Sequence, residues 1–202
     1  MYKILLITGG VYHDFMRNAL LLVEKLRNDR FDFEVTEDLS HLNFKKLAKK
    51  DVVLLYTLFK SINEYNKKAL LDFVEKGGKL LGLHSANASF LENHDYLEMI
   101  GSKFLYHPPK CRFVVRISKM HYITQGLEDF EIVDELYISE YNENVNILLE
   151  TDYNHQKVPI LYTKSFGLGK VVFFALGHDT TSILNRDFIR VFSRSLDWLI
   201  KE

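Results

Sequence analysis

Three histidines occupy positions where an α/β protein places its chemistry. His13, His84 and His178 each follow an aliphatic run typical of a buried strand, although they are far apart along the chain. In an open α/β sheet, functional groups collect outside the carboxyl ends of the parallel strands. An imidazole ring can bind a divalent metal ion, transfer a proton near neutral pH or donate a hydrogen bond. The sequence therefore predicts that these three side chains converge on one histidine-rich site.

The first part of the chain contains the elements that must position these histidines. Short aliphatic runs alternate with amphipathic stretches, a pattern typical of parallel strands connected by helices. In the predicted helix that follows the first strand, Leu20, Val23 and Leu26 are expected on the buried side. The predicted elements are strand 2–8, helix 14–28, strand 31–35, helix 42–47, strand 51–56, helix 63–76, strand 79–83 and helix 91–100.

The second part of the chain is richer in strands. A Gly-Leu-Gly sequence at 167–169 predicts a hairpin between the last two strands. The predicted elements are strands 112–118, 131–137, 145–150, 158–163 and 170–175, followed by an amphipathic helix at 187–200. The pattern favours a parallel core followed by an antiparallel extension. No Pro/Gly/Ser-rich linker interrupts residues 1–202, so we expect a single domain.

The composition argues against several functional classes. The formal net charge is −1, from 26 basic and 27 acidic residues, so the chain lacks the basic field that nucleic-acid binding requires. No apolar run approaches the roughly 18 residues of a membrane-spanning helix, so no membrane association is expected. The one cysteine, Cys111, cannot form an internal disulfide. These features predict a cytoplasmic protein.

Several short motifs resemble those of one known family. They are Thr8-Gly9-Gly10 with Tyr12-His13-Asp14-Phe15, residues 73–78 leading into Gly82-Leu83-His84-Ser85-Ala86, residues 100–104 with His107-Pro108, residues 121–127, Asp134-Glu135-Leu136-Tyr137, residues 166–171 and residues 175–179. In this order they resemble the ThuA-like family, which is named for trehalose utilisation. The resemblance implies a class I glutamine amidotransferase-like fold, a flavodoxin-like doubly wound and mainly parallel sheet with helices on both faces. It also implies a role in carbohydrate metabolism.

The resemblance further implies that this chain has lost glutaminase chemistry. Amidotransferases with this fold carry their nucleophile in a Gly-x-Cys-x-Gly turn, whereas this chain has His84 at the matching position. Cys111 opens a later strand and cannot supply the thiolate that the reaction needs. Ser85 suggests a serine hydrolase as an alternative, but that mechanism requires a histidine base, and the Gly-x-Ser-x-Gly pattern is absent.

A metal site is a further hypothesis for the histidines. His13, His84 and His178 are predicted ligands, and Glu135 and His107 supply a further carboxylate and imidazole, a set that suits zinc or a related divalent ion. In the alternative, the same histidines act as general acids and bases without metal. In either case His84, His178, Glu135 and His13 are the predicted catalytic residues.

We expect an enzyme that acts on a small sugar or keto-sugar derivative. His107, Tyr12, Ser85 and Asp179 are predicted to contact this carbohydrate ligand. Other aromatic residues predicted near the loops as stacking partners for a sugar ring are Tyr56, Phe59, Phe90 and Tyr106. The alternatives are a non-catalytic sugar-binding or regulatory domain, and a structural subunit of a larger assembly. A homodimer is the default expectation for oligomeric state.

Overall fold

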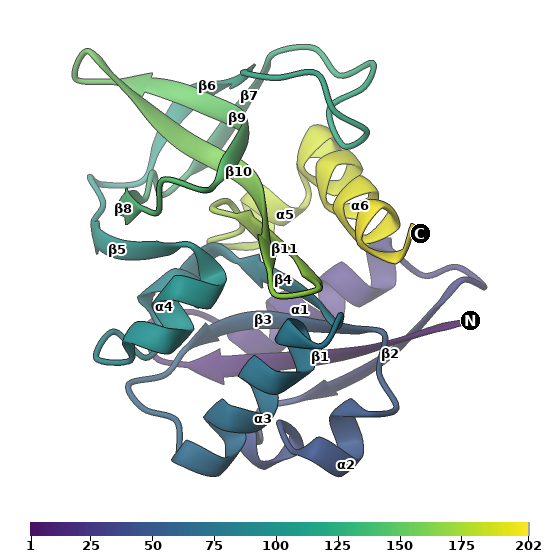
Figure 1. Ribbon diagram of the computed structural model, residues 1–202. Helices are drawn as coiled ribbons and strands as arrows, with labels where there is room; N and C mark the ends of the chain where they lie inside the picture. The colour runs from purple at the N-terminus through teal and green to yellow at the C-terminus, as the bar shows by residue number, and fades with distance from the viewer. Residues whose placement is uncertain (202) are drawn as a thin grey trace.

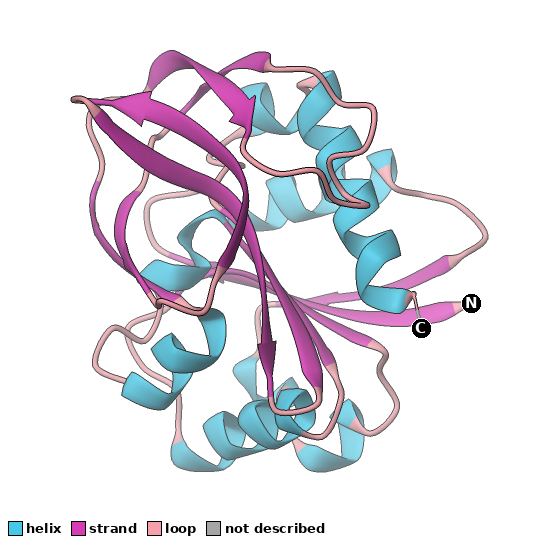
Figure 2. Cartoon of the chain, turned by 45° about the horizontal axis from the view of Figure 1, so that its top comes forward, coloured by secondary structure: helices cyan, strands magenta, loops and turns pink. Residues whose placement is uncertain are grey.

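The computed structural model describes residues 1–201 and shows a mixed α/β fold (Figures 1 and 2). A nine-stranded sheet forms its centre. From one edge to the other its strands are β2 (Phe31–Thr36), β1 (Tyr2–Gly10), β3 (Val52–Leu58), β4 (Lys79–Leu83), β11 (Gly169–Phe174), β10 (Gln156–Phe166), β9 (Asn146–Tyr153), β6 (Cys111–Ile117) and β7 (Phe130–Asp134). The strands from β2 to β11 are parallel to their neighbours, and those from β11 to β7 are antiparallel. The expected parallel core with an antiparallel extension is confirmed.

A two-stranded antiparallel sheet, β5 (Ser102–Tyr106) with β8 (Ile138–Tyr141), was not predicted. The helices are α1 (Phe15–Lys25), α2 (Phe44–Leu47), α3 (Glu64–Glu75), α4 (His94–Ile100), α5 (Thr180–Ile183) and α6 (Arg186–Ile200), with 3-10 helices η1 (Leu39–His41) and η2 (His84–Ala88). Within residues 1–201, none of these helices is long and apolar enough to cross a membrane.

Each face of the parallel strands packs into a separate hydrophobic core. Successive side chains of a strand point to opposite faces, so Ile4 and Leu6 of β1 enter one core while Leu5 and Ile7 enter the other. The first core includes apolar residues of α1 and α6, and the second includes residues of α3 and α4. The two sets of helices lie on opposite sides of the sheet in Figure 1. Because the strands from β2 to β11 are parallel, their carboxyl ends all lie at the same end of the sheet.

The buried face of α1 differs from the prediction. Leu20 is 53% exposed and Val23 is only partly buried, whereas Leu26 is buried as expected. The residues of the helix that face the core are Phe15, Asn18, Ala19 and Leu22. The prediction for Leu20 was wrong because the true buried face includes a polar residue, Asn18, which a search for apolar periodicity passes over.

Candidate functional site

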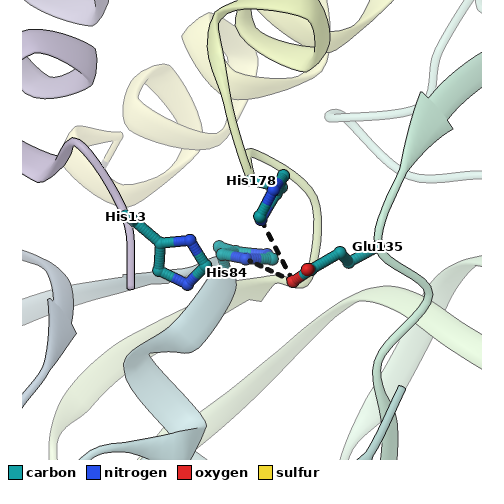
Figure 3. Close-up of side chains that lie close together, drawn as sticks. All are labelled: His13, His84, Glu135 and His178. Atoms are coloured by element: carbon teal, nitrogen blue, oxygen red, sulfur yellow. Dashed lines mark ion pairs between the residues drawn. The ribbon is translucent and has the colours of Figure 1, made fainter. Parts of the chain in front are cut away.

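The ends of four elements bring four potential metal ligands together (Figure 3). His13 lies in the loop after β1, His84 is the first residue of η2 after β4, Glu135 follows β7, and His178 lies between β11 and α5. One ligand atom from each residue can be chosen so that all four lie within 4.8 Å of one another. We call these four residues the histidine cluster. The structure thus places the three predicted histidines and the predicted carboxylate in one site.

His84 is held in one orientation by the backbone at the end of the sheet. It lies at the junction between β4 and η2, is fully buried, and has a φ of 50°, a left-handed conformation that costs a non-glycine residue energy. Its Nδ1 is 3.0 Å from the carbonyl oxygen of Ala175. Because a carbonyl only accepts hydrogen bonds, Nδ1 carries the proton. In the neutral ring, Nε2 therefore presents a lone pair to the cluster, where it lies 3.5 Å from Oε2 of Glu135.

Glu135 is the anionic centre of the cluster. Its Oε2 lies 3.1 Å from Nδ1 of His178, and its Oε1 lies 3.7 Å from Nε2 of His107. Burial alone would raise the pKa of Glu135, but His178 and His84 outweigh this effect and hold it below its ordinary value. In turn, the Glu135 carboxylate raises the pKa of His178. At neutral pH, Glu135 is therefore a carboxylate that attracts positive charge.

His13 completes the cluster as a neutral imidazole. Its ring packs edge-on against His84 and His178, with centroids 5.0 and 4.8 Å away. Burial and then the nearby His84 and His178 together lower the pKa of His13 to about 3. At neutral pH this ring therefore has one nitrogen with a free lone pair, the form in which imidazole binds metals.

Each member of the cluster has a buried polar atom without a hydrogen-bond partner among the described residues. These atoms are Nδ1 of His13, Nε2 of His84, Oε2 of Glu135 and Nδ1 of His178. The contact between Glu135 and His178 is short enough for an ion pair, but its orientation does not meet hydrogen-bond geometry. Most buried polar groups in proteins are hydrogen-bonded, and a group of exceptions can mark an ion site. Three imidazole nitrogens and one carboxylate oxygen match the donors that zinc prefers.

His107 stands beside the cluster rather than in it. Its side chain is 35% exposed, and its ring stacks on Tyr137 with centroids 5.6 Å apart and planes 16° apart. Its Nδ1 donates to the carbonyl oxygen of Pro108 at 2.8 Å, which leaves Nε2 directed to the side of Glu135. His107 is therefore a partly exposed imidazole next to the cluster.

Two other predicted contact residues neighbour the cluster. Tyr12, directly before His13, is 91% exposed with a φ of 74°. Asp179, directly after His178, caps α5 by accepting hydrogen bonds from the backbone of Thr181 and Ser182, and it pairs with Lys110. Tyr12 is therefore free to contact a ligand, whereas Asp179 already has structural partners. Their predicted role in substrate binding remains a prediction.

Several other residues that were predicted to act in the site are buried. Ser85 is fully buried and its Oγ has no hydrogen-bond partner among the described residues, so the serine–histidine pair of the hydrolase alternative is not formed. Tyr56 and Phe90 are also buried, so the prediction that they stack on a sugar was wrong. Tyr56 belongs to the core that includes α1 and α6, and Phe90 to the core that includes α3 and α4. Tyr106 is 52% exposed, and Phe59 is partly buried.

Asp134 is a buried acidic residue that the sequence analysis placed in a family motif but not among the predicted site residues. It ends β7, is completely buried and accepts hydrogen bonds from the backbone N–H groups of Glu135, Gly177 and His178. Burial raises its pKa. Its position directly before Glu135 could have indicated a role in the site. Nothing in the sequence, however, distinguishes a buried carboxylate at this position from a solvent-facing one.

A separate cavity of about 660 Å³ lies near the opposite edge of the parallel strands. Its lining includes Phe44, Phe73, Lys79 and Lys170, and none of the predicted site residues. The histidine cluster therefore lies at the carboxyl ends of the parallel strands, away from this cavity.

The fold and the cluster define a mixed α/β protein with a histidine-rich site at the carboxyl ends of its strands. The trehalose utilisation (ThuA) family matches residues 3–199, and the chain belongs to this family. No curated protein matches the chain.

Among solved structures, the chain is similar to a putative ThuA-like protein from Bacteroides uniformis ATCC 8492, with 18% identity, a TM-score of 0.86, and coverage of 100% of this chain and 92% of that chain. It is also similar to a cytoplasmic protein from Salmonella typhimurium LT2, with 16% identity, a TM-score of 0.76 and 100% coverage of both chains. A beta-galactosidase from Bacillus circulans sp. alkalophilus shares 13% identity at a TM-score of 0.68, over 98% of this chain and 30% of that chain. At these identities the likeness shows the fold alone.

Proposed function

We propose that this protein is a carbohydrate-active enzyme that binds a divalent metal ion through His13, His84, Glu135 and His178. The observation that carries the proposal is the convergence of these four residues: one potential ligand atom of each lies within 4.8 Å of the others, and each has a buried polar atom without a hydrogen-bond partner among the described residues. A set of unsatisfied donors is costly to bury, and a bound cation would satisfy them together. Such a metal ion would polarise a carbonyl or hydroxyl oxygen of the substrate or lower the pKa of a water molecule.

The protein's own residues prepare this site in three ways. The hydrogen bond from His84 Nδ1 to Ala175 fixes the tautomer and the direction of the ring, as the outer partners of metal-binding histidines commonly do. Glu135 supplies the negative charge that offsets a cation. His107 lies outside the cluster with its Nε2 on the side of Glu135, and we assign it to hold a polar group of the substrate by a hydrogen bond.

The substrate that we propose is a small sugar or keto-sugar derivative. Membership of the trehalose utilisation family supports a carbohydrate. The exposed ring of Tyr12 beside His13 supports a ligand with an apolar face, because aromatic rings pack against the C–H face of sugars. The strand order β2-β1-β3-β4-β11 supports the flavodoxin-like arrangement that the resemblance implies. A cytoplasmic location is part of the same proposal, supported by the name of the similar Salmonella protein.

Elemental analysis of protein purified without a metal-affinity tag tests the metal site. The wild type and the variant His94→Ala, which removes an exposed histidine at the start of α4, are expected to carry one equivalent of a divalent metal. The variant His178→Ala is expected to lose it. A wild type that contains no metal and binds none in a titration with Zn²⁺, Mn²⁺ or Co²⁺ would rule out the metal site.

A panel of sugars tests the substrate class. Metal-loaded protein incubated with trehalose, glucose and their keto derivatives is expected to show thermal stabilisation and a new product in the NMR spectrum. Saturable stabilisation without a product would instead indicate a non-catalytic sugar-binding domain. If none of these sugars stabilises the protein, the carbohydrate assignment is wrong even where the metal site holds.

A further inference from the structure

His178 lies in a segment that belongs to no strand or helix. β11 ends at Phe174 and α5 begins at Thr180, so neither a sheet ladder nor a helix holds the backbone of residues 177 and 178. Backbone polar groups in a protein interior must nevertheless find partners. Here the partners are buried side chains from three other elements.

Each backbone N–H and C=O group of Gly177 and His178 has a side-chain hydrogen-bond partner. The N–H of Gly177 donates to Oδ2 of Asp134 at 2.7 Å, and the N–H of His178 donates to Oδ1 of the same carboxylate at 3.2 Å. The hydroxyl of Tyr56 donates to the carbonyl oxygen of Gly177 at 2.6 Å. The side-chain amide of Asn18 lies 3.4 Å from the carbonyl oxygen of His178 and donates to the hydroxyl of Tyr56 at 3.1 Å. Asn18, Tyr56 and Asp134 come from α1, β3 and β7.

All three side chains are buried, so the network is isolated from solvent. Tyr56 and Asp134 are 0% exposed and Asn18 is 2% exposed. Buried polar groups that are fully satisfied fix one conformation, because moving any of them leaves a partner unpaired. Gly177 fits this geometry because its φ of 116° is one that side-chain-bearing residues rarely adopt.

Asp134 also connects His178 to Glu135. Its Oδ1 accepts the backbone N–H of Glu135 at 2.7 Å as well as that of His178. One buried carboxylate therefore fixes the backbone of two cluster members that lie more than 40 residues apart in sequence. Their side chains, Oε2 of Glu135 and Nδ1 of His178, meet at 3.1 Å.

We propose that Asn18, Tyr56 and Asp134 are positioning residues that set the metal affinity of the histidine cluster by fixing the Gly177–His178 backbone. The inference rests on the proposed function, because it requires the cluster to bind a metal ion. Residues that orient metal ligands typically alter metal affinity by about 10–100-fold when they are mutated.

The test compares two buried tyrosines. Tyr56→Phe removes the hydroxyl that holds Gly177 and keeps the ring. Tyr162→Phe is the matched control, because Tyr162 is equally buried and its hydroxyl donates to the carbonyl oxygen of Ile100 at 2.8 Å, in the core on the other face of the sheet. Asn18→Ala serves as a second variant should Tyr56→Phe fail to fold. Zn²⁺ affinity of metal-stripped protein is measured by calorimetry, and ligand geometry by the visible spectrum of the Co²⁺ form.

The expected result separates positioning from general stability. Both tyrosine variants are expected to lower the melting temperature of the metal-free protein by similar amounts. Only Tyr56→Phe and Asn18→Ala are expected to weaken Zn²⁺ binding about tenfold and to change the Co²⁺ spectrum. A wild type that binds metal and a Tyr56→Phe variant with the same affinity and spectrum would overturn the positioning role alone. A wild type that binds neither ion would overturn the metal site and the positioning role together.

Discussion

Replacing Gly10 by alanine tests how tightly the backbone restrains the loop that carries His13. Gly10 ends β1 with a φ of 127° and pairs with Leu58 of β3. An added Cβ would lie 2.3 Å from the carbonyl oxygen of Leu58 and 2.8 Å from its nitrogen. These atoms belong to a backbone held in the sheet, so they cannot move aside as a side chain can. The overlap must displace β3 or the start of the His13 loop.

Gly126 supplies the matched control for the conformational part of this cost. It also has a positive φ, 65°, but the nearest atom to an added Cβ is Nη2 of Arg190 at 3.9 Å. Gly126→Ala should therefore cost about 1 kcal/mol from the left-handed conformation alone. Gly10→Ala adds the overlap, at about 1–3 kcal/mol, to a strain of about 1–3 kcal/mol, which gives an expected loss of about 2–6 kcal/mol.

Urea denaturation of the metal-free proteins measures both losses in the free energy of unfolding, and calorimetry with Zn²⁺ measures the effect on the site. Gly10→Ala should also weaken metal binding, because Gly10 ends β1 three residues before His13, at the start of the loop that carries this histidine. Gly126→Ala should leave metal affinity unchanged. If Gly10→Ala destabilises the protein no more than Gly126→Ala does, the overlap is relieved at no cost and the reasoning about a rigid loop base is wrong.

Three further predictions address the metal, the surface charges and the ligand. Removing the metal with a chelator should lower the melting temperature by about 5–10 °C relative to protein at a free metal concentration one hundred times the dissociation constant; identical melting curves would contradict a bound metal. Hydrogen bonds from Lys46 and then Lys50 lower the pKa of Glu34 from 4.5 to about 2, so its contribution to stability is complete above pH 4.5 and is lost as the pH falls toward about 2. Glu34→Gln should therefore cost about 1 kcal/mol at pH 7, allowing for solvent screening, and the difference from the wild type in urea denaturation should shrink between pH 4.5 and 3; a constant difference would exclude this ionic origin. Tyr12→Ala should weaken binding of a stabilising sugar about fivefold, whereas Tyr65→Ala, which removes another exposed tyrosine, should leave the titration unchanged.

The sequence predicted the parallel core well because those strands are short, apolar and separated by helices. β4 has the predicted bounds, α3 is one residue shorter than predicted at each end, and α6 begins one residue earlier than predicted. β5 and β8 were missed because each pairs only with the other across more than 30 residues of chain. Such strands have neither the continuous apolar run of a central strand nor a nearby hairpin partner.

The site was predictable to the extent that it follows from the topology. The rule that parallel strands end at one edge was enough to bring His13, His84 and His178 together. Glu135 came from the family resemblance, and its predicted strand was too long, since β7 ends at Asp134. This earlier ending releases Glu135 from the sheet and lets its carboxylate reach the histidines. The strand boundary depends on the tertiary contacts of Asp134, which the local sequence does not encode.

The electrostatics of the metal-free cluster favour a cation over a set of protonated histidines. Protonating all three rings would place like charges within 4.8 Å of one another in a buried site. The low pKa of His13, about 3, reflects this cost together with burial. His84 is fixed by Ala175 with its free nitrogen toward Glu135. A divalent ion would meet one carboxylate and the lone pairs of His13 and of the neutral His84 ring, and it would have to displace the proton that Glu135 favours on His178. Metal binding at this site therefore requires little rearrangement, provided that the backbone of His178 stays where Asn18, Tyr56 and Asp134 hold it.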